Sequence, residues 1–218
     1  MNETNNISNS EINILNLYAG IGGNRKLWTG NIKVTAVESN PVIADIYQDF
    51  FPDDNVIVLD AHLFLQENFS KYDFIWSSPP CQTHSGMRQN LAVRYRGTSP
   101  EYPDMRLYQE IIFLKHNFKG LWCVENVRPY YKPLILPSVE LQRHILWANF
   151  LIKPKNFDGD SLRSAQIQDL QKHNGISLEK YKIPDKRQIL RNCVYPELGE
   201  YVFSEMKSHR QPSQIKLF

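Results

Sequence analysis

A cysteine in a stiff turn is the first residue of this sequence that could do covalent chemistry. Cys81 lies in the segment SPPCQ, directly after the apolar run FIWS. Two consecutive prolines restrict the backbone and would hold the thiol where the strand ends. A thiol near a helix start has a lowered pKa and more thiolate, so the segment predicts a nucleophile. The alternative is a small buried hydrophobe, which we expect of Cys123 and Cys193.

A carboxylate and an amide follow a second apolar run. Glu125 and Asn126 come near the end of the segment LWCVENV. Burial raises the pKa of a carboxyl group, so we expect Glu125 to be partly protonated and to donate a hydrogen bond as a general acid. The alternative is a surface acid that caps a loop.

A glycine turn and two acids indicate an adenosine ligand. The segment AGIGGN follows the run INILNLY and gives the pattern G-x-G-G, which is weak alone. Glu38 ends the next strand, at the distance where an acid accepts hydrogen bonds from ribose hydroxyls. Asp60 ends the strand after that, where a carboxylate could accept from an adenine amino group. The alternative is that both acids only cap the helices that follow them.

These residues come at the ends of strands in a predicted α/β fold. Tyr18, Glu38, Asp60 and Cys81 follow one another at intervals of 20, 22 and 21 residues. One strand-and-helix unit therefore separates each pair. The carboxyl ends of the strands in an open α/β sheet lie along one edge, where ligands bind, so these side chains should converge on one crevice.

The pattern of apolar and polar residues predicts the remaining elements. Strands are expected over 12–18, 33–38, 56–60, 72–77, 121–127 and 143–152. Helices are expected directly after the glycine turn, over 41–51, 61–69 and 106–118, and at the end of 187–206. Residues 83–104 should form a loop, because glycine and proline interrupt them. Residues 153–186 are polar, and we expect no core there.

Composition limits the class of protein. The 218 residues are 42% hydrophobic and 22% charged, as in a globular protein of about one domain. The formal net charge of +2 excludes a strongly basic nucleic-acid-binding protein, so the local distribution of charge must decide. No apolar run approaches the roughly 20 residues of a membrane span, and we expect neither membrane association nor a metal site. Three cysteines without a C-x-x-C pair fit a reducing, cytoplasmic location.

Five segments in a fixed order resemble the motifs of the DNA cytosine-5 methyltransferase family. They are NLYAGIGG, VESNP, DAH, SPPCQ and ENV. Further on, LQRHILWANF resembles the arginine-bearing strand of the family, and RNCVYPELGE resembles its closing motif. The resemblance covers about 12–150 and 187–204, and so many motifs in the family's order argue against chance.

The resemblance implies a Rossmann-like, S-adenosylmethionine-dependent methyltransferase fold: a mixed, mostly parallel sheet with helices on both faces and a small, reduced recognition lobe. The thiolate of Cys81 would add to C6 of a cytosine flipped out of double-stranded DNA, Glu125 would support N3, and C5 would take the methyl group. The catalytic residues that it implies are Cys81, Gln82, Glu125, Asn126 and Arg143. The residues that it implies for S-adenosylmethionine are Tyr18, Ala19, Gly20, Gly22, Gly23, Glu38, Ser39, Asp60, Ala61, Pro79 and Asn192.

The basic segment after the nucleophile is expected to contact DNA phosphates. Its candidate residues are Arg88, Arg94, Arg96 and Arg106. The alternative is a solvated basic loop.

The usual recognition domain of the family is missing from its place, because only about 35 residues separate the arginine-bearing strand from the closing motif. We expect a disordered tail over 1–10, a catalytic domain over 11–152 and 187–206, a reduced recognition or insert region over 153–186, and a loose tail over 207–218. A protein partner for target recognition and a bacterial or phage restriction-modification setting suit this layout. The alternatives are methylation of tRNA and a non-catalytic DNA-binding subunit.

Overall fold

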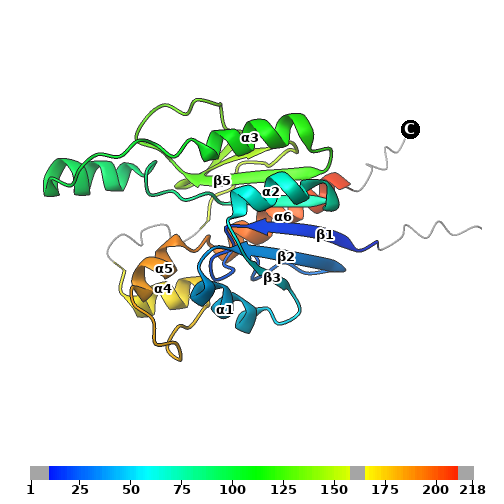
Figure 1. The fold of residues 1–218 in the computed structure, drawn as a ribbon, viewed down its shortest axis with the longest axis horizontal. Helices are drawn as coiled ribbons and strands as arrows, with labels where there is room; N and C mark the ends of the chain where they lie inside the picture. Colours follow the sequence, from blue (N-terminus) through cyan, green and yellow to red (C-terminus); the bar gives the residue numbers. More distant parts are fainter. Residues whose placement is uncertain (1–9, 158–164, 211–218) are drawn as a thin grey trace, which may run out of the picture.

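The computed structural model describes residues 10–157 and 165–210 and contains one seven-stranded sheet with helices on both faces (Figure 1). The expected N-terminal tail lies outside the described residues apart from Ser10. The expected C-terminal tail was placed too early, because the last helix continues to Arg210. Buried Met206 holds that helix against the sheet.

The sheet has the strand order β3-β2-β1-β4-β5-β7-β6, in which β7 alone runs opposite to the others. The strands are β1 (Ile12–Leu17), β2 (Ile32–Glu38), β3 (Asn55–Val58), β4 (Phe74–Ser77), β5 (Leu121–Val127), β6 (Val139–Leu141) and β7 (His144–Ala148). The four residues of β4 are all buried, because helices cover both faces of this central strand. The mixed, mostly parallel sheet confirms the predicted fold class. Strand β6 was not predicted, and β7 ends earlier than expected.

Six α-helices, one short 3-10 helix and one π-helix complete the fold. They are α1 (Pro41–Phe50), α2 (Ala61–Asn68), η1 (Phe69–Lys71), the π-helix η2 (Arg88–Tyr95), α3 (Arg106–Asn117), α4 (Ile167–Asn174), α5 (Lys186–Asn192) and α6 (Pro196–Arg210). The side chains of Asn40 and Asp60 cap the N-termini of α1 and α2. Helices α1, α2 and α3 confirm the predicted ranges within two residues. The expected loop over 83–104 instead contains η2.

The two faces of the sheet carry different helices. Helices α2 and α3 pack on one face, around Leu15, Ile75 and Val124. Helix α6 packs on the other face, around Phe74 and Trp76. Alternate residues of each strand therefore point into different cores.

The helix expected directly after the glycine turn does not form, because the C-terminal helix covers that segment. The ring of Trp28 stacks on the ring of Phe203 in α6 with 5.1 Å between their centroids. The indole Nε1 of Trp28 donates a hydrogen bond of 3.1 Å to the carbonyl oxygen of Gly199. A Cβ on Gly199 would overlap the backbone of Asn24, so α6 lies directly on the turn.

The region between β7 and α5 has a core, contrary to the expectation from its polar sequence. Leu170, Ile176 and Leu178 are buried together with Ile21 of the glycine turn and Ile46 of α1. The polar residues around them hid these few apolar positions in the sequence. Helices α4 and α5 therefore pack against α1 and the glycine turn, at the lower left of Figure 1.

Candidate active site

The proposed nucleophile lies at the topological switch point of the sheet. Strands β1 and β4 are neighbours, although two strands separate them in the sequence. The glycine turn follows β1, and Cys81 follows β4. Ligands of open α/β sheets bind at such points, where connections diverge to the two sides of the sheet.

Strand β5 holds the Pro-Pro-Cys turn in place. The amide Nδ2 of Asn126 donates a hydrogen bond of 2.9 Å to the carbonyl oxygen of Pro79. The carbonyl oxygen of Cys81 accepts from the backbone N–H groups of His84 and Ser85 at 3.1 and 2.9 Å. Asn126 is 1% exposed, so this hydrogen bond joins β5 to the Pro-Pro-Cys turn inside the protein.

The thiol of Cys81 is not activated in this structure, which corrects the expectation of a lowered pKa. Burial and the negative charge of Glu125 raise the pKa of the Cys81 thiol to about 11, while Arg143 acts in the opposite direction. The turn therefore presents a protonated thiol near a carboxylate.

Glu125 is buried and ionised, which corrects the second expectation. Burial alone would raise the pKa of Glu125, but the charge and hydrogen bond of His144, the hydroxyl of Ser78 and the charge of Arg143 together lower it below its usual value. The Nδ1 atom of His144 lies 2.5 Å from Oε1 of Glu125, and each side chain is 6% exposed. The sequence reasoning had considered the apolar strand alone and missed this partner on β7.

His144, and not Arg143, contacts the carboxylate. Arg143 lies in the turn that precedes β7, and His144 is the first residue of β7 and pairs with Val127 of β5. Both residues line a cleft, and Arg143 acts on Cys81 and Glu125 through its charge.

The glycine turn leaves one side of Gly20 open. Gly20 and Gly22 have φ angles of 53° and 83°, and no atom lies within 4 Å of the position of a Cβ on Gly20. The backbone N–H of Gly20 donates to Oε2 of Glu38 at 3.0 Å. A Cβ on Gly22 or Gly23 would instead overlap Phe51 or Cys193, so these glycines serve packing within the chain. Open space therefore adjoins Gly20 beside the carboxylate of Glu38, which also accepts from the backbone N–H of Asn40 at 2.9 Å.

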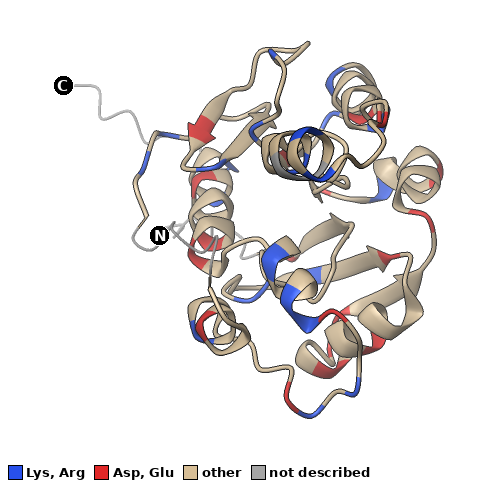
Figure 2. Cartoon of the chain, turned by 90° about the vertical axis from the view of Figure 1, so that its left-hand side faces the viewer, with Lys and Arg blue, Asp and Glu red and all other residues tan. Residues whose placement is uncertain are grey.

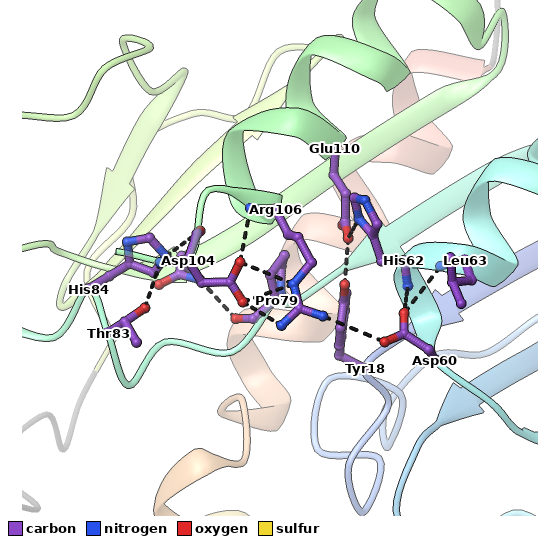
Figure 3. A network of polar contacts seen from close by, with 11 residues as sticks. Tyr18, Asp60, His62, Leu63, Pro79, Thr83, His84, Asp104, Arg106 and Glu110 are labelled. Atoms are coloured by element: carbon purple, nitrogen blue, oxygen red, sulfur yellow. Dashed lines mark hydrogen bonds and ion pairs between the residues drawn. The ribbon is translucent and has the colours of Figure 1, made fainter. Parts of the chain in front are cut away.

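Asp60 and Arg106 form a chain of ion pairs at the same edge (Figure 3). Oδ1 of Asp60 accepts from two backbone N–H groups at the start of α2, which confirms the capping interpretation. Oδ2 of Asp60 lies 3.5 Å from Arg106, whose other nitrogens bind Asp104. Hydrogen bonds from Arg106 hold the pKa of Asp104 below its usual value. Arg106 thus begins α3 and is held by Asp60 and Asp104 at the carboxyl edge of the sheet, so it is not part of a solvated basic loop.

A buried carboxylate on α3 anchors the aromatic residue of the glycine motif. The hydroxyl of Tyr18 donates to Glu110 at 2.5 Å, and the hydroxyl of Ser77 donates to the same carboxylate at 2.6 Å (Figure 3 shows Tyr18 and Glu110). Nδ1 of His62 lies 3.0 Å from it. Glu110 is 0% exposed. Sequence reasoning missed Glu110 and His62, because a carboxylate on an amphipathic helix reads as solvent-facing.

A cleft of about 550 Å³ separates the carboxyl edge of the sheet from α4 and α5. One wall continues from the nucleophile turn and from β5, and includes Ser85, Val127 and Arg143. The other wall includes His173 and Arg191. Helix η2 contains Arg88 and Arg94, and α5 contains Lys186, Arg187 and Arg191; Figure 2 shows lysine and arginine in blue along the chain.

The other predicted residues lie along the same edge in various environments. Ala19 and Ala61 are buried, and Gln82 is exposed. Oγ of Ser39 lies 3.5 Å from Glu38. Oδ1 of Asn192 accepts from Gln188 at 2.6 Å. Among the residues expected to contact DNA, Arg88 pairs with Glu101, whereas Arg94 and Arg96 are exposed.

A comparison with protein families identifies the chain. The family model of the C-5 cytosine-specific DNA methylases matches residues 12–128, which is more than half of the chain. The chain belongs to this family. Its methyl donor is the methyl donor of the cytosine-5 DNA methylases, S-adenosylmethionine, and the open space beside Gly20 and Glu38 fits that group.

Solved methyltransferase structures resemble this chain over part of their length. A mutant of DNMT2 from Spodoptera frugiperda is 22% identical, with a TM-score of 0.44, over 68% of this chain and 54% of its own. A methyltransferase from Agrobacterium tumefaciens is 15% identical, with a TM-score of 0.38, over 57% and 41%. The chain spans about half the length of these two proteins. A comparison with curated proteins finds no match.

Two further properties concern only the residues that the structure describes. Over 10–157 and 165–210, no helix is both long and apolar enough to cross a membrane. Within the same ranges, histidine, cysteine, aspartate and glutamate nowhere form a group of three that could hold a metal ion.

Proposed function

We propose that this protein methylates C5 of cytosine in double-stranded DNA through a covalent bond between Cys81 and C6 of a flipped base. The observation that carries the proposal is that Cys81 follows β4 while Glu125 lies near the end of the adjacent parallel strand β5, so both groups lie at the carboxyl edge of the sheet. A thiol, a buried carboxylate and an adenosyl site at one sheet edge suit this reaction and little else.

The roles follow from the positions. Cys81 forms the S–C6 bond, and the ring electrons move toward N3, where Glu125 supports a proton. Bound S-adenosylmethionine supplies an electrophilic methyl group. Asn126 holds the Pro79 carbonyl and thereby the turn that carries the thiol. Arg143 lines the cleft and favours the thiolate by its charge.

The cofactor residues are proposed on the same footing. Gly20 allows the cofactor to approach the backbone closely, and Glu38 accepts hydrogen bonds from the ribose hydroxyls. Asp60 accepts from the adenine amino group once Arg106 releases Oδ2 of Asp60 and pairs with Asp104 alone. Tyr18 packs on the adenosyl group, with Glu110 fixing its hydroxyl. Helices α4 and α5 line the second wall of the cleft and take the place of a larger recognition domain in binding DNA.

The test is incubation of the purified protein with tritiated S-adenosylmethionine and DNA of mixed sequence, beside tRNA and a Cys81→Ala control. Bisulfite sequencing of labelled DNA then gives the target sequence. Label at C5 in DNA that the variant loses supports the proposal. Label confined to tRNA moves the substrate class and keeps Cys81. No label in any nucleic acid, with cofactor binding intact, favours a non-catalytic subunit or one that needs a partner protein.

A further inference from the structure

His144 and Glu125 form a buried pair with a single short contact. Nδ1 of His144 lies 2.5 Å from Oε1 of Glu125, on adjacent antiparallel strands. Both side chains are nearly excluded from water. At this separation, one proton lies between the ring nitrogen and the carboxylate oxygen, because two bare acceptors would repel each other.

The charges around this pair come from several elements. Arg143 precedes His144 in the turn before β7, and Cys81 lies in the turn after β4. The hydroxyl of Ser78 reaches Glu125 from the same turn. Cys123 precedes Glu125 on β5 and senses its charge. On the other wall of the cleft that His144 lines stand Arg191 and His173 of α5 and α4.

An ionised Glu125 cannot protonate a base. The proposed reaction places negative charge on N3 of the cytosine when the thiolate adds to C6, and that charge requires a proton. The carboxylate therefore has to receive a proton before or while it donates one. An arginine at this position would hold the carboxylate equally well, but its guanidinium does not release a proton, whereas histidine exchanges one near neutral pH.

We propose that His144 supplies, through Glu125, the proton that N3 of the target cytosine takes up when Cys81 adds to C6. This inference rests on the proposed cytosine-5 methylation. The Cys81 thiol first loses its proton to water. As the S–C6 bond forms, the C5–C6 π electrons shift to C4–C5 and the C4–N3 electrons shift to N3. A proton passes from Nδ1 of an imidazolium to Oε1 of Glu125, and a proton passes from Glu125 to N3. C5 then takes the methyl group, and water takes the C5 proton. As the thiolate leaves, the C4–C5 electrons return to C5–C6 and the N3–H electrons return to C4–N3, so that N3 gives its proton to Glu125 and Glu125 gives one to His144.

The position of His144 suits such a return. It lines the 550 Å³ cleft as well as contacting Glu125, so its ring connects the buried carboxylate with the side from which the DNA enters. His144 is thus a positioning residue for Glu125 and its source of a proton.

The experiment uses a duplex that contains the sequence methylated by the wild-type chain. Single-turnover methylation is measured from about pH 5.5 to about pH 9 for wild type, His144→Arg and His144→Gln. His116→Gln, an exposed histidine at the end of α3, is the matched control. Thermal unfolding shows which variants fold. Covalent capture of Cys81 by a duplex with 5-fluorocytosine at the target position follows bond formation at C6.

We expect His144→Arg to lower the single-turnover rate and the capture rate by about 100-fold, the size of a general acid contribution, with an unchanged KM for DNA. The variant should also lose the solvent deuterium isotope effect that we expect for the wild type. His144→Gln gives the same result should the arginine not fold. His116→Gln should match the wild type.

Either variant with the wild-type rate and pH profile would overturn the inference, and so would a wild-type rate that is equal in H2O and D2O. Absence of Cys81-dependent methylation by the wild-type chain would overturn both this inference and the proposed function. The two failures therefore differ in the wild-type result.

Discussion

The thiol of Cys81 and the carboxylate of Glu125 oppose each other electrostatically. The charge of Glu125 favours the neutral thiol, while His144, the hydroxyl of Ser78 and Arg143 together keep Glu125 ionised. A resting thiol with a pKa of about 11 is nearly inert at neutral pH. We interpret this as protection of the nucleophile until a base enters the site.

Replacing Glu125 with glutamine should lower the pKa of Cys81, because one of its two main causes, the carboxylate charge, disappears while burial remains. Alkylation of Cys81 by iodoacetamide at mildly alkaline pH should then be faster, by about tenfold for each unit of pKa change. Mass spectrometry of the Cys81 peptide measures this rate. Glu67→Gln, on the exposed face of α2, should leave it unchanged. A slower or equal rate in Glu125→Gln would contradict the electrostatic interpretation.

Tyr18→Phe should destabilise the fold although it removes a single oxygen atom. The hydroxyl satisfies a carboxylate that is fully buried, so its loss should cost about 1–3 kcal/mol of unfolding free energy. Urea unfolding measures the difference. Tyr102→Phe, at a tyrosine that is 95% exposed, is the control and should change nothing. Equal stability of Tyr18→Phe and wild type would mean that Glu110 needs no third donor.

At the scale of elements, the contact between His62 of α2 and Glu110 of α3 joins two helices and depends on pH. The hydrogen bond to Glu110 raises the pKa of His62 above its usual value, against the effect of burial. The stabilisation by the protonated ring is therefore complete below the unfolded pKa of about 6.5 and is lost as the pH rises through the higher folded pKa. His62→Gln should be less stable than wild type at acid pH, and the difference should shrink as the pH rises.

Chemical unfolding of wild type and His62→Gln at several pH values between about 5 and about 9 tests this dependence. His116→Gln, whose ring is exposed, should follow the wild type at every pH. A difference between His62→Gln and wild type that grows with pH would show that the sign is wrong.

Helix α6 approaches the glycine turn so closely that a usually favourable substitution should fail. Gly→Ala inside a helix normally gains about 1 kcal/mol. A Cβ on Gly199 would overlap backbone atoms of Asn24, which cannot move aside as a side chain would. We expect Gly199→Ala to lose about 1–3 kcal/mol in urea unfolding. Ser208→Ala, exposed on the same helix, should be neutral or stabilising; a gain at both positions would contradict the close contact.

Local patterns predicted the elements whose residues follow one period, and failed where distant segments decide. The runs of β1, β4 and β5 and the helices α1 to α3 could be recognised because their apolar residues repeat within the element. The segment after the glycine turn could not, because α6, far along the chain, takes the place of a helix there. The core beneath α4 was missed because its few apolar residues are buried against Ile46 of α1 and Ile21 of the glycine turn, which lie far away in the sequence.

The candidate site shows the same division. The order of motifs predicted that Cys81, Glu125, Glu38 and Asp60 share the carboxyl edge, since strand order alone requires it. Their states of ionisation came out opposite for Cys81 and Glu125, because each depends on a partner from another strand. The spacing of motifs predicts which side chains lie at the carboxyl edge of the sheet. It does not predict which charged side chains from other strands lie next to them there.

At the scale of the whole molecule, a nearly neutral protein has to bind a polyanion through few residues. The formal net charge is +2, so the exposed arginines around the cleft carry the interaction that we propose with DNA. Arg106 is held by Asp104 and Asp60, which leaves Arg94 and Arg96 as the exposed candidates of that segment.

Arg94→Gln should weaken DNA binding and reduce the slope of log affinity against log salt by about 0.9, the value for one phosphate contact. Fluorescence anisotropy with a labelled duplex at a series of salt concentrations measures the slope. Lys33→Gln lies at the amino end of β2, away from the carboxyl edge, and should leave the slope unaltered. An unchanged slope for Arg94→Gln would remove η2 from the DNA interface.

The contact between Trp28 and Gly199 joins positions 171 residues apart. A ribosome adds about 5–20 residues each second, so the first turn of the fold waits roughly 10–30 s for the helix that covers it. During that time Trp28 and the inner face of the sheet have no cover, and a chaperone has access to them. The glycine turn is synthesised early but reaches its folded conformation only after α6 has been made. A nascent chain stalled before α6 should therefore contain the whole glycine motif and still fail to bind the methyl donor.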